Sequence, residues 1–359
     1  MSRELYAGLM SGTSLDGVDA VLVEFSARSA SVLRHVHEAF EPSLRAELLA
    51  LQAPVSGELE RAATCGNRLA RVYAQAFAAL GADRPVQAIG CHGQTVRHRP
   101  DAGYTLQIGN AALLAELTRT RVVADFRSRD IAAGGQGAPL VPAFHAAAFR
   151  SPAENRVVLN LGGIANVSWL PAGGDVRGFD TGPGNCLIDL WAARHLGRSY
   201  DDRGTWASGG RVNAPLLATM LMEPYFTMPP PKSTGRDLFN EAWIERHLAA
   251  SPDPQSVQAT LVELTAKSVA SAVERYCTGA ARVIACGGGV ANARLMERLG
   301  AALAPVALES SDRHGLDPTA VEAAAFAWLA RESLAGRPGN LPAVTGATGL
   351  RVLGAIYPP

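Results

Sequence analysis

The stretch "AGLMSGTSLDGVDAVLVEF", residues 7–25, decides the fold class of this chain. Its flanks, "LYAGLM" and "VDAVLVEF", carry the apolar and β-branched residues that are typical of buried strands. The join between them, "SGTSLDG", holds two glycines, three hydroxyl groups and a carboxylate, although a hairpin needs only two turn residues. The flanks therefore predict two paired strands, and the join raises the question of what so many donors would bind.

A second hairpin of the same kind follows later in the chain. The segment "RVVLNLGGIANVSWLP", residues 156–171, again predicts a strand, a glycine turn and a strand, and "VRGFD" follows as a third strand. Gly12 and Gly162 hold equivalent places in the two hairpins, 150 residues apart. The first hairpin is likewise followed by a third strand-like run, residues 31–40. We infer a duplicated unit of three strands plus helices.

The rest of the chain supports this duplication. "RVIACGGGVANARLMERL" echoes "VQAIGCHGQT" as an apolar strand that enters a glycine loop, and Cys286 stands opposite Gly90, 196 residues apart. The second half therefore carries about 46 extra residues, which we place in 199–250, around the Pro-rich loop "MPPPKSTGRDLFN". Helical patterns such as Leu59–Leu80 alternate with the strands, so we expect an α/β fold with mixed sheets. A cleft between two such halves is a natural ligand site.

Composition limits the classes of function. The chain has 359 residues, of which 48% are hydrophobic and 18% charged, so it can form two domains with buried cores. Lys plus Arg and Asp plus Glu both number 33, which argues against a nucleic-acid or anionic membrane surface. The five cysteines form no CxxC pair, so we expect neither a zinc site nor a disulfide framework. With no signal-peptide pattern and no apolar run of membrane-spanning length, we expect a soluble cytoplasmic protein.

Three glycine turns follow apolar strands: "SGTSLDG", "LGGIAN" and "CGGGVAN". Glycine lets backbone N–H groups approach a phosphate and form an anion-binding nest. Thr13 and Ser14 can add hydroxyl donors, and Asp16 or Asp19 can hold Mg²⁺ through water. A single turn of this kind is more often a plain hairpin, but three in a duplicated frame favour ATP. The chain has no P-loop motif, and Asn292 replaces the last glycine of a dinucleotide fingerprint.

The motif "RGFDTGPGNCLIDLW" places Asp180 at the end of a predicted strand. Asn185 is a suitable N-cap for a helix that begins near Cys186, and the positive end of that helix would point toward Asp180. Such a carboxylate can act as a general base. Alternatively, it can stabilise the following bend as an Asx-turn. The residues alone leave both interpretations open.

Other polar residues stand at the ends of predicted elements. His92, Gln94 and Thr95 follow the strand "VQAIGC", Asp125 and Arg127 end "RVVADFR", and Lys232, Ser233, Thr234 and Asp237 lie in the long loop. Glu322 lies on the last helix among small apolar residues, so it needs a partner if it is buried. His92 is as readily functional as structural, whereas His35, His37, His98, His195 and His247 are expected to be structural.

The chain resembles the anhydro-N-acetylmuramic acid kinase family in seven motifs that occur in the family's order. They are "GLMSGTSLDGVD", "GCHGQT", "ADFRSRDIAAGGQGAPLVPAFH", "LNLGGIAN", "GFDTGPGN", "STGRDLFN" and "CGGGVAN". The resemblance implies an actin-like ATPase fold with two duplicated RNase H-like domains, 1–150 and 151–359, with an active-site cleft between them. The final helix would pack back on the first domain. It also implies a cytoplasmic homodimer.

The resemblance further implies a reaction. The family uses ATP and Mg²⁺ to open the 1,6-anhydro ring of anhydro-N-acetylmuramic acid with water and to phosphorylate the freed 6-oxygen. The products, N-acetylmuramic acid 6-phosphate and ADP, belong to cell-wall recycling. The expected partner is therefore a small-molecule sugar, not a nucleic acid or a membrane.

Site residues follow from the matching motifs. Asp180 matches the catalytic base, which would take a proton from the attacking water. The resemblance assigns to the nucleotide Gly12, Thr13, Ser14, Leu15, Asp16, Gly17, Val18, Asp19, Gly162, Gly163, Asn166, Gly287, Gly288, Gly289 and Asn292. Asp16 and Asp19 are also expected to hold Mg²⁺ through water. For the sugar, the resemblance suggests His92, Gln94, Thr95, Asp125, Arg127 and Glu322. The fork of Arg127 suits the lactyl carboxylate.

Two other functions remain open at this point. An ordinary sugar kinase of the same fold would use Asp180 to deprotonate a sugar hydroxyl instead of water. An ATP-gated assembly protein like actin or Hsp70 would hydrolyse ATP with no small-molecule acceptor. The sequence contains no separate peptide-binding domain, which argues against the second alternative.

Overall fold

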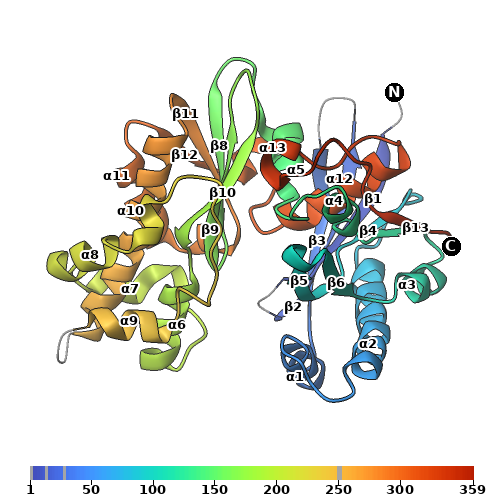
Figure 1. Ribbon diagram of the computed structural model, residues 1–359, viewed down its shortest axis with the longest axis horizontal. Coiled ribbons are helices and arrows are strands. Elements are labelled where there is room, and N and C mark those ends of the chain that lie inside the picture. The colour runs from blue at the N-terminus through green and yellow to red at the C-terminus, as the bar shows by residue number, and fades with distance from the viewer. Residues whose placement is uncertain (1–2, 13–14, 27–29, 249–252) are drawn as a thin grey trace. The chain divides into compact units, whose positions relative to one another are not determined.

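The computed structural model describes residues 3–12, 15–26, 30–248 and 253–359 (Figure 1). The chain folds into two compact units: unit 1 runs to Ala148 and takes in Gly315–Pro359, and unit 2 is Phe149–His314. The expected division, 1–150 and 151–359, differs in the last 45 residues, which belong to unit 1. Their membership has a physical cause in a close helix–sheet contact described below.

Unit 1 is built on a six-stranded mixed sheet with the order β13-β7-β4-β1-β2-β3. Its strands are β1 (Glu4–Met10), β2 (Gly17–Phe25), β3 (Ala30–Ala39), β4 (Ile89–Cys91), β7 (Val122–Ala124) and β13 (Ala355–Tyr357). The first three form an antiparallel meander, β4 runs parallel to β1, and β7 runs parallel to β4. The predicted strands near residues 5–10, 18–25 and 31–40 are confirmed within one residue at each end.

The other elements of unit 1 cover this sheet. They are α1 (Pro42–Ala50), α2 (Glu58–Ala79), β5 (Gln94–Arg99), η1 (Pro100–Ala102), β6 (Tyr104–Ile108), α3 (Ala111–Thr118), α4 (Ser128–Ala132), α5 (Val141–Phe149), α12 (Val321–Leu334) and α13 (Pro342–Thr345). The predicted helix 59–80 is thus α2. Tyr73 and Leu69 of α2 are buried against the apolar side chains of β1 and β2.

Helix α12 explains why the C-terminal segment belongs to unit 1. A Cβ on Gly8 would lie 1.9 Å from the carbonyl oxygen of Ala323, and one on Gly90 would lie 2.0 Å from that of Phe326. Only glycine on the strands and small side chains on the helix allow this approach. Strand β13 then pairs with β7 and ties the end of the chain to the same sheet.

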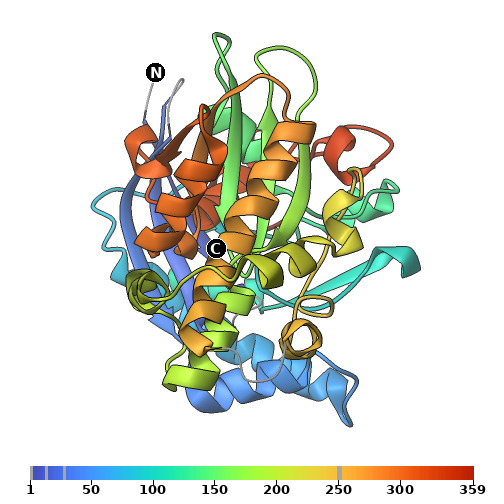
Figure 2. The same ribbon diagram turned by 90° about the vertical axis from the view of Figure 1, so that its left-hand side faces the viewer.

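Unit 2 has a five-stranded mixed sheet with the order β10-β9-β8-β11-β12. Its strands are β8 (Asn155–Leu161), β9 (Ile164–Leu170), β10 (Arg177–Pro183), β11 (Ala280–Cys286) and β12 (Ala307–Ser310). Its helices are α6 (Cys186–Leu196), η2 (Asp202–Gly204), α7 (Thr205–Gly209), α8 (Ala214–Leu221), η3 (Pro224–Thr227), α9 (Glu241–His247), α10 (Pro254–Tyr276), η4 (Gly288–Ala291), α11 (Ala293–Leu303) and η5 (Ser311–His314). Figure 2 shows α10 lying along the strands of this sheet.

The two sheets share one topology, which confirms the predicted duplication. The order β7-β4-β1-β2-β3 in unit 1 matches β12-β11-β8-β9-β10 in unit 2, and each strand pair runs in the same relative direction. This is the arrangement expected of duplicated RNase H-like domains. The extra residues placed in 199–250 are also confirmed, because α7, α8, η3 and α9 all lie between α6 and α10. Among the described residues, no helix is both long and apolar enough to cross a bilayer.

Candidate active site

The first glycine loop joins β1 to β2. Thr13 and Ser14 lie outside the described residues. Leu15 has a left-handed backbone with φ +56°, and its N–H donates to the carbonyl of Gly12 at 3.3 Å. A leucine in this conformation is strained. A Cβ on Gly17 would lie 2.3 Å from the carbonyl oxygen of Glu38. The end of the loop at Gly17 therefore packs closely against β3.

Asp19 of β2 stands beside two histidines of β3. Its Oδ1 accepts hydrogen bonds from Nε2 of His35 at 3.0 Å and from Nδ1 of His37 at 3.1 Å. Burial by itself would raise the pKa of Asp19, but these hydrogen bonds lower the pKa below its usual value. The hydrogen bond with Asp19 in turn raises the pKa of His35. Both histidines were expected to be structural. It is the pairing of β2 with β3 that brings them to Asp19, and this proximity is not visible in the sequence.

The described residues contain no group of three or more His, Cys, Asp or Glu side chains arranged to hold a metal ion. An ionised carboxylate such as Asp19 nevertheless suits Mg²⁺, which prefers oxygen ligands and keeps part of its water shell. Since His35 and His37 both donate to one oxygen of Asp19, these residues fit an ion held through water better than one held directly. Asp16 is exposed at the end of the same loop.

His92 and Arg127 form a buried pair in unit 1. Nε and Nη2 of Arg127 donate to Nε2 of His92 at 3.1 and 2.9 Å, and Nη1 donates to the carbonyl of Gly137 at 2.9 Å. Burial and the charge of Arg127 lower the pKa of His92 to about 3, so the ring is neutral. Burial lowers the pKa of Arg127 to about 10, which leaves it charged. Much of the fork assigned to a lactyl carboxylate is therefore already engaged by the protein.

Glu322 of α12 is electrostatically linked to this pair. Burial raises its pKa, and the charge of Arg127 partly offsets that rise. A carboxyl group in this position can form hydrogen bonds with a sugar hydroxyl. The structure thus places His92, Arg127 and Glu322 in one neighbourhood of unit 1.

Gln94, Thr95 and Asp125 have other contacts. Nε2 of Gln94 donates to the carbonyl of Gly12 at 3.1 Å, which connects the predicted sugar residues to the first glycine loop. Nδ1 of His92 and Oε1 of Gln94 are buried with no hydrogen-bond partner in the part of the chain that the structure describes. Thr95 accepts a hydrogen bond from Gln107. Asp125 has φ +56° and accepts one from Ser128.

Asp180 is held at three points by one segment of unit 2. Its backbone N–H donates to the carbonyl of Lys232 at 3.1 Å, and the hydroxyl of Tyr225 donates to its carbonyl at 2.8 Å. The backbone N–H of Thr234 donates to its Oδ2 at 3.0 Å. The carboxylate therefore accepts from a distant loop, not from the bend at Thr181–Gly184, and the Asx-turn alternative does not describe it.

The electrostatics of Asp180 suit a general base. Burial raises the pKa of Asp180 to about 6, while the N–H of Thr234 and the charge of Lys232 act in the opposite direction. The ammonium of Lys232 donates to the carbonyl of Tyr225 at 3.0 Å and lies 4.6 Å from the centre of the Tyr225 ring. At pH 7 the carboxylate is ionised, and its basicity is well above that of an exposed aspartate.

Two local expectations around Asp180 need correction. Strand β10 continues to Pro183 with a bulge between Asp180 and Gly182, so Asp180 lies inside the strand instead of at its end. Asn185 is the N-cap residue of α6, but its side chain makes no capping hydrogen bond and donates instead to the carbonyl of Leu161 at 3.0 Å. The bulge keeps β9 and β10 paired through the glycines, since the register resumes at Gly182.

The second glycine loop joins β8 to β9 and contacts the start of α6. The carbonyl of Gly163 accepts hydrogen bonds from the N–H groups of Gly184 and Cys186, and that of Gly162 accepts one from Asn185. A trans peptide holds its C=O and N–H in opposite directions. The N–H of Gly163 shares its peptide with the carbonyl of Gly162, so it points away from α6.

The third glycine loop packs against the second. A Cβ on Gly287, which has φ +86°, would lie 2.4 Å from Oδ1 of Asn160, and one on Gly289 would lie 2.9 Å from the amide of Asn185. Asn292 caps α11, because its side chain accepts from the N–H of Leu295 at 3.0 Å. Asn166 pairs with Asp180 in the sheet. In unit 2 the structure thus packs the second and third glycine loops together at the start of α6, and it pairs Asn166 with Asp180 in the sheet.

The loop between η3 and α9 holds Asp180, a role that was not predicted from the sequence. Lys232 and Thr234 were noted as polar loop residues without an assigned role, and Tyr225 and Arg236 were not considered. Lys232, Thr234 and Tyr225 hold Asp180 in the structure. The density of polar residues in "KSTGRD" was the available signal, but nothing local to it indicates which strand the loop covers.

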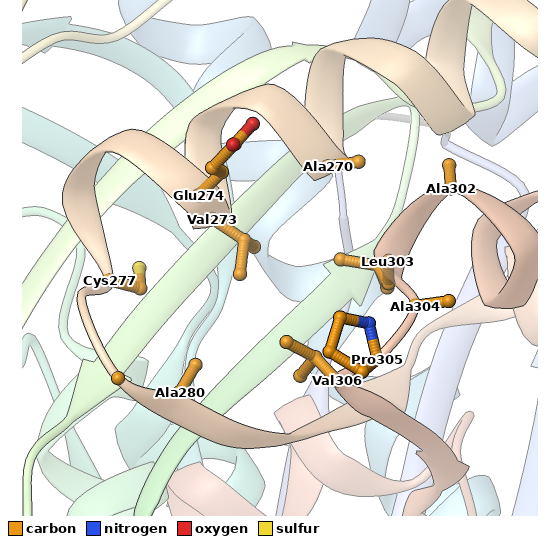
Figure 3. A pocket seen from close by; sticks show the side chains of 11 residues that line it. Ala270, Val273, Glu274, Cys277, Ala280, Ala302, Leu303, Ala304, Pro305 and Val306 are labelled. Carbon is orange, nitrogen blue, oxygen red and sulfur yellow. The ribbon is translucent and has the colours of Figure 1, made fainter.

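One hollow lies at the other end of the unit 2 sheet from the glycine loops. It has a volume of about 320 Å³ and is lined by the end of α10, the start of β11 and residues 302–306 (Figure 3). The glycine loop lies at the opposite end of β11, after Cys286. The hollow offers one carboxylate, Glu274, and one buried thiol, Cys277, among small apolar side chains. None of the residues predicted for catalysis, nucleotide or sugar lines it.

Comparisons with known proteins agree on one family. The family model of anhydro-N-acetylmuramic acid kinase matches residues 4–359. A curated relative of that name from Burkholderia cenocepacia is 56% identical, covering 99% of this chain and 96% of its own length. Those from Nitrosospira multiformis and Thiobacillus denitrificans are 52% and 54% identical, covering 100% and 99% of this chain. Among solved structures, a ROK family glucokinase from Streptomyces griseus in complex with glucose and AMPPNP covers 90% of this chain at 14% identity and a TM-score of 0.42, which is too weak to bear on function.

Proposed function

This chain belongs to the anhydro-N-acetylmuramic acid kinase family, and we propose that Asp180 is the general base of its reaction. The enzyme opens the 1,6-anhydro ring of the sugar with water and phosphorylates the freed 6-oxygen from ATP. The products are N-acetylmuramic acid 6-phosphate and ADP, and the pathway is cell-wall recycling. The observation that carries the assignment of Asp180 is its fixed, buried carboxylate with a raised pKa of about 6.

Asp180 removes a proton from water as that water attacks the anomeric carbon. The bond between the anomeric carbon and the bridging oxygen breaks, and the departing 6-oxygen attacks the terminal phosphorus of ATP. Oδ2 of Asp180 accepts from the N–H of Thr234, and Oδ1 accepts no hydrogen bond within the described residues, so it is the oxygen suited to the water. A base whose pKa lies one unit below neutral pH is ionised yet still a strong acceptor.

The glycine loops are assigned to the nucleotide. The residues around Gly12 and Gly163 contribute backbone N–H groups to its phosphates, as nests of this kind do. The segment Gly287–Gly289 and Asn292 lie beside the adenosine in this assignment. Mg²⁺, when bound, neutralises charge on the phosphates, and Asp16 and Asp19 would hold it through water.

The sugar is assigned to residues of unit 1. Glu322 forms hydrogen bonds with sugar hydroxyl groups, which a carboxyl group on this helix can accept. Nδ1 of His92 and Oε1 of Gln94 are buried polar atoms without protein partners among the described residues, which supports their use by a polar ligand. Thr95, Asp125 and the remaining N–H groups of Arg127 complete the set, with Arg127 nearest in chemistry to the lactyl carboxylate.

A cytoplasmic location and a homodimer complete the proposal. All five cysteines are free and buried, which suits a reducing compartment. The homodimer rests on the family resemblance, and light scattering of the purified chain would measure it directly. A mass corresponding to one chain would remove this part without affecting the reaction.

The deciding experiment measures ADP release with Mg-ATP in the presence of 1,6-anhydro-N-acetylmuramic acid, N-acetylmuramic acid or N-acetylglucosamine. We expect release that depends on the anhydro sugar, with oxygen from labelled water at the anomeric carbon of the product. Turnover of an open-ring sugar alone would identify an ordinary sugar kinase. ATP hydrolysis that ignores every sugar would favour an ATP-gated assembly protein.

A further inference from the structure

We propose that Arg236 is a further catalytic residue, which binds the terminal phosphoryl group of ATP over the second glycine loop. This inference rests on the proposed function, since it needs ATP at that loop. The guanidinium would form charge-assisted hydrogen bonds to the phosphoryl oxygens, on which charge is spread in the transition state.

The position of Arg236 carries the first part of the inference. Its Nη2 and Nε lie 3.7 and 3.9 Å from the point that a Cβ on Gly163 would occupy. The carbonyl of Gly162, which shares its peptide with the N–H of Gly163, is turned toward the start of α6, where it accepts from Asn185. The guanidinium therefore lies against a loop that has no side chain at this position, beside the peptide whose N–H faces the other way.

The charge of Arg236 is left available by the protein. Within the described ranges, its guanidinium forms no hydrogen bond and no ion pair within 4 Å, in contrast to Arg298, which pairs with Glu263. Burial raises the pKa of Asp189 in α6 to about 6, and the nearby charge of Arg236 partly offsets that rise without a direct ion pair. The side chain is exposed, and a cation in this setting suits an anionic ligand.

The backbone around Arg236 is fixed, although its side chain is not. Nδ2 of Asn240 donates to the carbonyl of Arg236 at 3.3 Å and to that of Asp237 at 2.8 Å. Phe239 is buried in the core of unit 2, and its N–H donates to the carbonyl of Gly235 at 3.1 Å. This hydrogen-bonded backbone therefore keeps the guanidinium close to the second glycine loop. Less entropy is then lost when the guanidinium binds a ligand.

The same loop selects the terminal phosphoryl group over the inner ones. Thr234, two residues before Arg236, donates to the carboxylate of Asp180, which acts where the phosphoryl acceptor is released. Of the three phosphates, the one being transferred must lie nearest to that acceptor. A cation on the loop that positions Asp180 is thus expected to contact the transferred phosphoryl group. Occupation of Arg236 would also steady the Thr234–Asp180 hydrogen bond.

The test compares ADP with the imido analogue AMPPNP, which retains a third phosphate. Dissociation constants are measured by calorimetry, without sugar, for the full chain and for Arg236→Ala, Arg236→Lys and the exposed control Arg246→Ala. We expect Arg236→Ala to raise the dissociation constant of AMPPNP by about tenfold or more and that of ADP by less than about twofold. The reason is that a charged hydrogen bond is lost only with AMPPNP. Turnover falls by about 10²-fold or more. Arg236→Lys is intermediate, and Arg246→Ala is unchanged.

Two results would overturn the proposal: equal weakening of ADP and AMPPNP by Arg236→Ala, or no change in either. Thermal melts of each variant show whether the fold is retained. The binding comparison needs no turnover, so its failure is distinguishable from failure of the proposed function. AMPPNP binding that depends on Arg236, without turnover of the anhydro sugar, would contradict the proposed reaction. It would still support the proposed contact between Arg236 and the terminal phosphate.

Discussion

The two units share a sheet topology, yet they shift the pKa of a carboxylate at one edge of the sheet in opposite directions. In unit 1, β3 is the edge strand, and its two histidines donate to Asp19 and hold the pKa of that group below its usual value. In unit 2, β10 is the edge strand, and burial raises the pKa of Asp180 to about 6. Asp19 is therefore the more stable anion, whereas Asp180 accepts a proton more readily.

The difference comes from what covers each edge strand. The second unit carries the additional elements α7, α8, η3 and α9, and the loop among them contacts Asp180 through Tyr225, Lys232 and Thr234. In the described part of unit 1, the neighbour of Asp19 is the exposed face of β3. A duplicated fold can thus provide a charge site in one copy and an acid–base site in the other, because desolvation and hydrogen bonding act on the same group with opposite signs.

The largest expected effect tests the base. Asp180→Asn removes the proton acceptor but keeps an oxygen for the N–H of Thr234. Turnover of the anhydro sugar should fall by about 10²- to 10⁴-fold, while AMPPNP binding by calorimetry stays within about twofold of the unaltered chain. Near-normal turnover would remove Asp180 from the mechanism and end the comparison.

A smaller effect tests the charge site. Asp19→Asn should raise the Mg²⁺ concentration for half-maximal turnover by about tenfold, as expected for an outer-sphere ligand. Turnover at saturating Mg²⁺ should recover most of its original value. Titration of Mg²⁺ in the ADP-release assay measures this. An Asp19→Asn loss that excess Mg²⁺ does not restore would contradict the assignment.

A third prediction concerns pH. Since Asp180 must be ionised, kcat/KM should fall about tenfold per pH unit below its pKa of about 6. The charge of Lys232 lowers that pKa, so Lys232→Met should move this acid limb upward by about one unit. The control is Lys267→Met, an exposed lysine of α10, which should leave the limb in place. A limb that does not respond to Lys232→Met would belong to another group.

The smallest effect concerns stability. The folded-state pKa of Asp180 lies above its unfolded value, so stability increases as pH falls from about 6 to 4 and decreases at neutral pH. Asp180→Asn should therefore raise the free energy of unfolding at pH 7.5 by about 1–3 kcal/mol. Asp19→Asn should lower it, because the depressed pKa of Asp19 contributes stability above pH 4. Urea unfolding of the two variants at pH 7.5 measures these opposite signs, and equal signs would contradict the comparison.

Much of the fold was predictable from short segments. Strand and turn residues adjoin in the sequence, so the hairpins at Gly12 and Gly162 and the duplication they imply follow from local patterns. The strand limits of β1, β2 and β3 agree with the prediction within one residue. The sequence did not predict that β10 continues past Asp180 through a bulge, because that depends on pairing with β9.

The candidate site was also predictable only in part. The sequence by itself determined which residue types stand at the strand ends and glycine turns, and it made Asp180, His92 and Arg127 candidates for the site. Only the tertiary structure decided that α12 packs on Gly8 and Gly90, that Arg127 donates to His92, and that the loop at Lys232–Arg236 closes over Asp180 and Gly163. The reason is physical: turns and strands depend on neighbouring residues, whereas burial, and with it every shifted pKa, depends on segments brought together from distant parts of the chain.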